Sequence, residues 1–255
     1  MTVAAEALVH RYGARSALDG VSFAAPARGS VTILIGPNAA GKSTLFKAMA
    51  GLVAPSEGRL MLGGADMAGL SRRERTRRVG LMPQAFVCNA ALTVFEVVLL
   101  ARKQLSGWSV EREDVVAVSV LLERMGISHL ARALVGELSG GQGQMVSAAQ
   151  ALARGPEVFL FDEPTSALDL RRQLELLGLI VAETRARNVV TFVAMHDLNL
   201  AARFGDAALL MRDGRILAQG APDDVLADPC VGETYGVVLD LIPHPKGGFH
   251  VSASL

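Results

Sequence analysis

The nine residues GPNAAGKST, at positions 36–44, decide the fold of this chain. They match the pattern G-x-x-x-x-G-K-[ST] and follow an apolar run at residues 31–35 that is typical of a buried strand. Helical periodicity then covers residues 43–50. A strand, a loop and a helix in this order direct backbone N–H groups and the helix N-terminus at one point, where they can bind phosphate. The stretch therefore predicts a phosphate-binding loop; the alternative is a glycine-containing turn that only caps a helix.

Three residues of this loop have predicted roles in binding a nucleoside triphosphate. Gly41 allows the backbone to approach the phosphates closely, and the Lys42 ammonium would reach the β- and γ-phosphates. The Ser43 hydroxyl would bind magnesium. The whole loop supplies candidate nucleotide contacts, which are Gly36, Pro37, Asn38, Ala39, Ala40, Gly41, Lys42, Ser43 and Thr44.

A second motif, FLFDEP at residues 159–164, is an apolar run that ends in two acids. Strand ends in a parallel sheet meet the bound nucleotide, so Asp162 is a candidate magnesium partner, direct or indirect. Glu163, one residue further, is the candidate general base that would orient and deprotonate an attacking water. The alternative is that both acids are merely solvated or cap a helix.

A third motif, LSGGQ at residues 138–142, begins a helical segment. Ser139 is a good helix cap, while Gly140 and Gly141 leave backbone N–H groups uncovered. Glycine costs about 1 kcal/mol against alanine inside a helix. These glycines are therefore explained by a second anion contact, with an ordinary capped loop as the alternative.

The pattern of the rest of the chain predicts a mostly parallel α/β sheet. Apolar runs typical of buried strands alternate with helical segments. The runs lie at residues 31–35, 158–161, 189–194 and 207–211, and helical segments lie at 43–50 and 171–186. Residues 4–25 and 58–62 fit an antiparallel β edge better than the parallel core.

The predicted domain organisation has three parts. Residues 1–84 and 153–220 form a core that includes the antiparallel part, and residues 85–152 form an inserted α-helical lobe. The lobe is predicted from helical patterns at residues 93–103, 110–125 and 141–154. Residues 221–255 form a C-terminal extension with a short helix in APDDVLADP and a final strand in HVSASL.

Composition excludes several classes of protein. The 25 basic and 25 acidic side chains balance, so no global field favours nucleic acid. The hydrophobic fraction of 51% is high, yet the longest apolar stretch, residues 85–101, contains Asn89 and Glu96, and we predict no membrane-spanning helix. The surplus apolar surface instead favours a docking face for a partner. Cys88 and Cys230 lack metal-ligand spacing and are interpreted as thiols of a reducing compartment.

Together with SALD at residues 166–169 and His196, these motifs make the chain resemble an ABC transporter ATP-binding subunit over nearly its full length. The resemblance implies a P-loop NTPase core, ATP and Mg²⁺ as ligands, and a head-to-tail homodimer. In that dimer, LSGGQ of one copy closes over the ATP of the other, so Ser139, Gly140, Gly141 and Gln142 would act in trans.

The resemblance also implies roles for residues outside the two glycine-rich motifs. Tyr12 matches the aromatic residue that stacks on adenine, and Asp169 matches a residue at the dimer seam. Gln84 would lie near magnesium and the coupling interface, and His196 would be the switch histidine of the catalytic set, with Lys42 and Glu163. The alternatives are an ordinary strand aromatic for Tyr12, a turn residue for Gln84 and a structural histidine.

Two other segments, LTVFEVVLLARK at residues 92–103 and TYGVVLDLI at 234–242 followed by GGFHV, resemble the ATPases of iron-chelate, haem and cobalamin importers. That implies an integral-membrane permease, a periplasmic substrate-binding protein served indirectly, and a peripheral location on the cytoplasmic face of the inner membrane. An ATPase of another transporter class, a soluble ABC protein without a transport role and an inactive regulatory module are the alternatives.

The chain departs from the family pattern at a few positions. Ala39 stands where the family usually has glycine, and Gly143 and Met145 follow LSGGQ where basic residues are usual. The basic run SRRERTRR at residues 71–78 is interpreted as a solvated helix face, with phospholipid or permease contact as the alternative. Trp108 has no predicted role.

Overall fold

A computed structural model of the chain describes residues 2–84, 91–104, 107, 109–243 and 249–255. Cys88, Trp108 and the glycines at 247 and 248 lie outside the described residues. The first part of the apolar stretch at residues 85–101 does so too.

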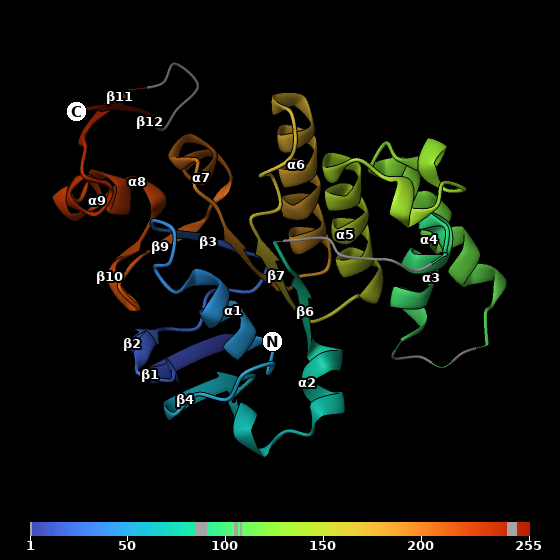
Figure 1. Ribbon diagram of the computed structural model, residues 1–255, viewed down its shortest axis with the longest axis horizontal. Helices are drawn as coiled ribbons and strands as arrows, with labels where there is room; N and C mark the ends of the chain where they lie inside the picture. Colours follow the sequence, from blue (N-terminus) through green and yellow to red (C-terminus); the bar gives the residue numbers. More distant parts are fainter. Residues whose placement is uncertain (1, 85–90, 105–106, 108, 244–248) are drawn as a thin grey trace.

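A six-stranded sheet forms the centre of the molecule (Figure 1). Five neighbouring strands are parallel, and only the edge strand β10 is antiparallel to its neighbour β9. In spatial order the strands are β10 (Arg215–Gly220), β9 (Ala207–Arg212), β3 (Val31–Ile35), β8 (Val190–Ala194), β7 (Val158–Asp162) and β6 (Val79–Met82). The predicted mostly parallel sheet is confirmed, and β6 is a strand that the apolar pattern did not indicate.

The inner strands β3, β7 and β8 are buried on both faces, which explains why they are mostly apolar rather than alternating. Along β7, Phe159 and Phe161 belong to one apolar cluster and Leu160 belongs to another. The first cluster contains residues from the helices on both sides of β7 in the chain, including residues 94–98, 118–122, 145–153 and 176–180, and the second contains the antiparallel part. The sheet is thus the middle layer of the protein.

The predicted antiparallel part is a separate four-stranded sheet rather than an edge of the central one. Its strand order is β2 (Arg15–Phe23), β1 (Val3–Tyr12), β4 (Glu57–Leu62) and β5 (Ala65–Asp66). Helix α1 (Lys42–Met49) packs between the two sheets, with Phe46 and Met49 fully buried. This packing fixes the helix that follows the phosphate loop.

Three helices form a lobe at one side of the molecule, drawn in green and yellow-green in Figure 1. They are α3 (Val94–Lys103), α4 (Arg112–Arg124) and α5 (Gly140–Arg154), and short 3-10 turns lie at Ser128–Leu130 and Val135–Glu137. One apolar cluster runs from these helices into the central sheet. The lobe and the central sheet therefore share one hydrophobic core, although the lobe is formed by a separate segment of the chain.

The basic run at residues 71–78 forms helix α2 (Arg72–Arg78), which begins with a capping box between Ser71 and Glu74. None of its residues is buried. A short 3-10 turn at Met67–Gly69 precedes it. The helix surface is therefore exposed in the single chain, which both interpretations of the basic run allow.

The second half of the chain completes the layer of helices. It contains α6 (Leu170–Ala186), α7 (Leu198–Phe204), α8 (Pro222–Ala227) and α9 (Pro229–Tyr235), followed by the hairpin of β11 (Val238–Pro243) and β12 (Phe249–Ser254). Figure 1 shows α8, α9 and the hairpin at the end of the molecule opposite the helical lobe. Across the described ranges, no helix combines the length and the apolar character needed to cross a membrane.

Asp114 of α4 forms hydrogen bonds with two residues at the end of α3. Its carboxylate accepts hydrogen bonds from Arg102 Nε at 2.8 Å and Lys103 Nζ at 2.8 Å. It also accepts one from the Glu111 backbone N–H at 3.1 Å. The hydrogen bonds from Lys103, Glu111 and Arg102 hold the pKa of this carboxyl well below its ordinary value. The lobe therefore depends on the charged form of Asp114.

We expect Asp114→Asn to lower the midpoint of thermal unfolding at pH 7. The native pKa is depressed, so the stabilisation is fully present above the unfolded-state pKa of about 3.9 and is lost as the pH falls toward the native value. The gap between variant and wild type should therefore shrink below about pH 4. Thermal unfolding followed by circular dichroism between pH 3 and pH 7 measures it.

Glu175→Gln is the matched control, because Glu175 pairs with Arg171 and Arg172 on an exposed helix face. Exposed ion pairs contribute little to stability. Equal losses in the two variants, or a gap for Asp114→Asn that does not change with pH, would contradict the assignment.

Candidate nucleotide-binding site

The predicted site residues come together because the parallel strands end at one edge of the central sheet. The phosphate loop follows β3, and Glu163 follows β7 directly. His196 lies two residues after the end of β8, and Gln84 lies two residues after the end of β6. Carboxyl ends of parallel strands form the usual ligand-binding edge of an open α/β sheet. Residues separated by up to 160 positions in sequence thereby face one region.

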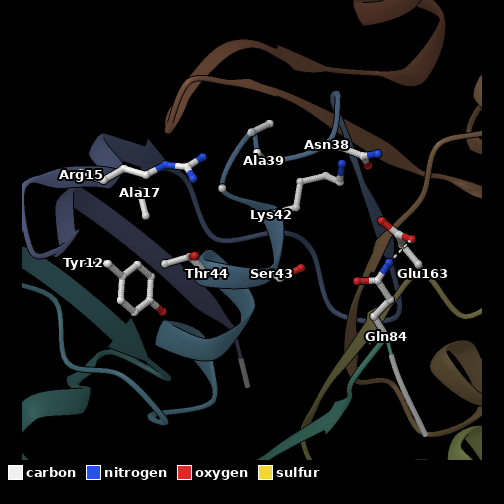
Figure 2. A pocket seen from close by; sticks show the side chains of 12 residues that line it. Tyr12, Arg15, Ala17, Asn38, Ala39, Lys42, Ser43, Thr44, Gln84 and Glu163 are labelled. Atoms are coloured by element: carbon white, nitrogen blue, oxygen red, sulfur yellow. Dashed lines mark hydrogen bonds between the residues drawn. The ribbon is translucent and has the colours of Figure 1, made fainter.

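A cavity of about 500 Å³ opens at this edge (Figure 2). Its walls contain residues 38–44 of the phosphate loop together with Gln84 and Glu163. Three residues of the antiparallel sheet close its far end, and these are Tyr12, Arg15 and Ala17. The volume suits a small molecule that reaches from the antiparallel sheet to the end of β7.

Lys42 lies inside the phosphate loop and is only 6% exposed. Its Nζ donates to the carbonyl oxygens of Gly36 at 2.5 Å and Pro37 at 3.0 Å. Burial lowers the pKa of this amine, whereas the nearby carboxylates of Glu163 and Asp162 raise it. The ammonium is thus held by neutral carbonyl groups, which a phosphate oxygen could replace as a stronger acceptor.

The loop backbone needs unusual conformations at its first and fourth residues. Gly36 has φ of 146°, and a Cβ atom there would lie 2.1 Å from the Met211 carbonyl oxygen. Only glycine fits this close approach. Ala39 has φ of 64°, a left-handed conformation that costs an L-residue about 1–2 kcal/mol. The departure noted at Ala39 therefore does place strain in the loop.

The Glu163 carboxylate lies between two polar side chains. Its Oε2 accepts a hydrogen bond from Gln84 Nε2 at 2.7 Å, drawn as a dashed line in Figure 2. Its Oε1 shares a hydrogen bond of 2.5 Å with His196 Nε2. The backbone at Glu163 is left-handed, with φ of 52°. Strained residues of this kind persist where the surrounding structure holds them, and they gather at functional sites.

Asp162 and Ser43 provide an environment that fits a magnesium ion. The Asp162 side chain is 5% exposed, and its Oδ1 has no hydrogen-bond partner among the described residues. Burial raises the pKa of this carboxyl, against the lowering effect of a hydrogen bond with the Ser43 side chain. A hard cation beside these oxygens would satisfy the buried carboxylate. Magnesium takes one or two carboxylates and phosphate oxygens, so this small donor set is sufficient.

Tyr12 lies in the cavity wall with a ring that is half exposed and is in edge-to-face contact with His10. Sequence reasoning missed Arg15 and Ala17 beside it. A two-residue turn after Tyr12 pairs it with Arg15 across the hairpin. The available signal for Arg15 was its position: it is a basic residue that follows the candidate stacking residue Tyr12 after a short turn.

A second missed residue is Gln144, in the helix that LSGGQ begins. Its side chain is 4% exposed, and Nε2 donates to the Glu163 carbonyl at 2.7 Å and to Ser166 Oγ at 3.0 Å. Its Oε1 accepts from the Ala167 backbone N–H at 2.9 Å. Gln144 therefore fixes the strained backbone at Glu163 to helix α5. A glutamine two residues past a glycine-rich motif gave no signal of such a contact.

The LSGGQ residues do not line the cavity of their own chain. The Ser139 side chain accepts a hydrogen bond from Gln142 N, and the Gln142 side chain accepts one from Ser139 N, which forms a capping box. Gly141 packs close to the SALD segment, since a Cβ there would lie 2.8 Å from the Ala167 carbonyl oxygen. Ser139 and Gly140 are exposed. The motif is therefore available to another molecule.

Asp169 is also outside the cavity. Its side chain accepts a hydrogen bond from the Arg172 backbone N–H at 2.9 Å, as the cap of α6. The site of a single chain thus brings together the phosphate loop, Tyr12, Gln84, Glu163 and His196. It leaves Asp169 and LSGGQ, residues 138–142, on other surfaces.

Comparison with known proteins agrees with this geometry. The sequence model of the family described as ABC transporter matches residues 18–166, which is more than half of the chain. The hemin import ATP-binding protein HmuV of Streptomyces coelicolor is 38% identical over 236 residues, covering 92% of this chain and 84% of its own length. The ferric enterobactin transport ATP-binding protein FepC of Escherichia coli is 34% identical over 247 residues, covering 95% and 90%.

The fold is also similar to that of an ATP-binding cassette solved as a dimer in a post-hydrolysis state with ADP and phosphate bound. The TM-score is 0.78 at 26% identity, and the match covers 86% of this chain and 98% of the other. That relative, which binds ADP and phosphate, therefore has the same architecture as the chain with the cavity at the edge of its sheet. The chain belongs to the ABC transporter family, as one of its ATP-binding, ATP-hydrolysing subunits.

Proposed function

We propose that this chain supplies the energy for an importer that carries haem or a ferric siderophore into the cell. The observation that carries the hydrolytic part is the Glu163 carboxylate, held between Gln84 and His196 at one end of the cavity that contains Lys42. The cargo is inferred from relatives named for hemin import and ferric enterobactin transport. The resemblance of residues 92–103 and 234–242 to such importers supports the same class of cargo.

In this proposal, ATP lies along the cavity from the antiparallel sheet to the end of β7. The exposed ring of Tyr12 stacks on adenine, which places the phosphates against residues 36–44. Backbone N–H groups of the loop and the N-terminus of α1 donate to the phosphate oxygens. Lys42 leaves the carbonyls of Gly36 and Pro37 and donates to the β- and γ-phosphates.

Ser43 and Asp162 would hold the magnesium ion, with the Gln84 carboxamide nearby. Bound there, magnesium would neutralise charge that develops on the phosphate oxygens. This chain's own contribution is to exclude water from Asp162 and to present its unpartnered oxygen to the cation.

Glu163 would act as the general base, and the structure indicates what must change before it can. Both of its oxygens already have partners, Gln84 on one side and His196 on the other. Displacement of the Gln84 amide would free Oε2 to accept a proton from an attacking water. Gln84 lies in the chain between β6 and α3 of the helical lobe, so its movement would couple the lobe to the chemistry.

The complete site would need a second copy of the chain. Ser139 and Gly140 are exposed, and neither lines the cavity of its own chain. A head-to-tail homodimer would place LSGGQ of one copy on the γ-phosphate held by the other. Asp169 would then lie at the seam between the copies. A solved relative that is a dimer with ADP and phosphate supports this arrangement.

The membrane partner would dock on the helical lobe. Large apolar side chains are exposed on this lobe, and they are Leu100, Val110, Val115, Val116, Val120 and Leu134. A permease that covers them would explain their exposure. The chain would then be peripheral on the cytoplasmic face of the plasma membrane. A periplasmic substrate-binding protein would deliver the cargo to the opposite side of that permease.

We expect Glu163→Gln to bind ATP with an affinity near that of wild type and to lose turnover by about 10²–10⁴-fold, the usual contribution of a general base. Lys42→Ala is the control, and we expect it to impair ATP binding, the step before hydrolysis. Loss of its charged hydrogen bonds should weaken ATP binding by about 10- to 100-fold. Phosphate release measures turnover, and calorimetric ATP titration measures affinity. Wild-type turnover in Glu163→Gln would remove Glu163 from the role of base.

The cargo is tested by transport. A strain that lacks its own haem and siderophore import ATPases, and that expresses this chain with a candidate permease and substrate-binding protein from the same source organism, should take up labelled haem or a ferric siderophore. Glu163→Gln in the same strain should abolish uptake, which makes it the matched control. Uptake of a different cargo, such as cobalamin, with neither iron chelate transported, would assign the chain to another importer class.

A further inference from the structure

The phosphate loop has a hydrogen-bond partner in the C-terminal extension, about 200 residues further along the chain. The backbone N–H of Gly36 donates to the hydroxyl oxygen of Tyr235 at 2.8 Å. Tyr235 is the last residue of α9, and Gly36 is the first residue of the loop. Gly36 lies inside residues 18–166, where the family pattern matches, whereas Tyr235 lies outside them.

The Gly36 residue is held on three sides. Its N–H donates to Tyr235, and its carbonyl oxygen accepts from Lys42 Nζ at 2.5 Å. Its Cα faces the Met211 carbonyl so closely that no side chain fits there. Neither the Tyr235 hydroxyl nor the contact with Met211 involves Lys42, so both would remain to orient the first peptide group of the loop when Lys42 moves to a phosphate.

Tyr235 itself is firmly placed. The side chain packs against the large apolar cluster, and Val231 in the same helix is fully buried. The helix ends at Gly236, in the left-handed conformation with φ of 69°. Burial raises the pKa of the Tyr235 hydroxyl, so it is neutral at physiological pH and can accept from an N–H group.

The extension makes a second contact beside the site, on the helix that follows His196. Asn199 in α7 donates from Nδ2 to the Val251 carbonyl at 3.1 Å and accepts at Oδ1 from the Val251 N–H at 2.7 Å. Val251 lies in β12 of the terminal hairpin. The extension therefore touches both the loop that holds phosphate and the helix next to the histidine.

We propose that Tyr235 is a positioning residue for ATP binding, whose hydroxyl holds the first peptide group of the phosphate loop in the orientation that phosphate requires. The loop binds phosphate through backbone N–H groups, which act best when they are already aligned. Without the hydroxyl, the buried Gly36 N–H would lose its partner and the loop would have to find another orientation. The C-terminal extension thus contributes to nucleotide affinity.

The test compares Tyr235→Phe with Asp228→Ala in the full chain. Tyr235→Phe keeps the ring and removes only the hydroxyl. Asp228→Ala removes a different hydrogen bond of the same helix, the cap to Cys230 N at 2.9 Å, and does not touch the loop. Calorimetric titration gives the ATP dissociation constant, phosphate release gives kcat and KM, and amide hydrogen exchange reports on Gly36.

We expect Tyr235→Phe to raise the ATP dissociation constant and KM by about three- to tenfold, the effect of one lost hydrogen bond, with a much smaller change in kcat. The Gly36 amide should exchange faster in this variant. Asp228→Ala should lower thermal stability while leaving ATP affinity and Gly36 exchange at wild-type values.

Unchanged affinity and unchanged Gly36 exchange in Tyr235→Phe would overturn the proposal, as would equal effects of the two variants. If a variant does not fold, amide hydrogen exchange of the wild-type protein still tests the proposal. Rapid exchange of the Gly36 amide in the nucleotide-free protein would show that the hydrogen bond with Tyr235 does not persist, and would overturn the proposal. The inference rests on ATP binding at this loop. Wild type that bound no ATP would refute the proposed function instead.

Discussion

The parallel alignment of β3, β8, β7 and β6 is the constraint on which the rest of this structure depends. Because their carboxyl ends share one edge, four chain segments reach the same small region. The register aligns Asp162 with Ala194, and Ala194 also lies opposite Leu34. Strand pairing therefore sets the spacing of the backbone segments that carry the phosphate loop, Glu163 and His196. The two buried faces of the sheet stabilise that alignment.

Much of this arrangement could be predicted from local sequence patterns. The phosphate loop was recognisable because a glycine-rich stretch stood between a buried strand and a helix. Strands β3, β7, β8 and β9 were recognisable because burial on both faces makes them mostly apolar. Strand β6 was not, since it has only four residues and contains Gly80, which packs against Pro156.

The residues that sequence reasoning missed act through distant partners. Gln144 contacts the backbone of residues 163–167, Arg15 faces the cavity from across a hairpin, and Tyr235 reaches Gly36. The position of Arg15 follows from the short turn after Tyr12. The contacts of Gln144 and Tyr235, by contrast, do not follow from spacing in the sequence, because they depend on how separate elements pack. The same is true of the strained backbone at Glu163, which Gln144 helps to hold. Local pattern therefore indicates the chemistry, and tertiary packing determines how it is positioned.

In the proposed dimer, each chain supplies only part of the working site and ATP joins two copies. The mass of the Glu163→Gln variant at saturating ATP and magnesium, measured by analytical ultracentrifugation, tests this arrangement. We expect twice the mass of a single chain. Adding Ser139→Arg should restore the single-chain mass, because the bulky side chain blocks LSGGQ. A single-chain mass for Glu163→Gln with ATP bound, also in the presence of the permease, would contradict the account.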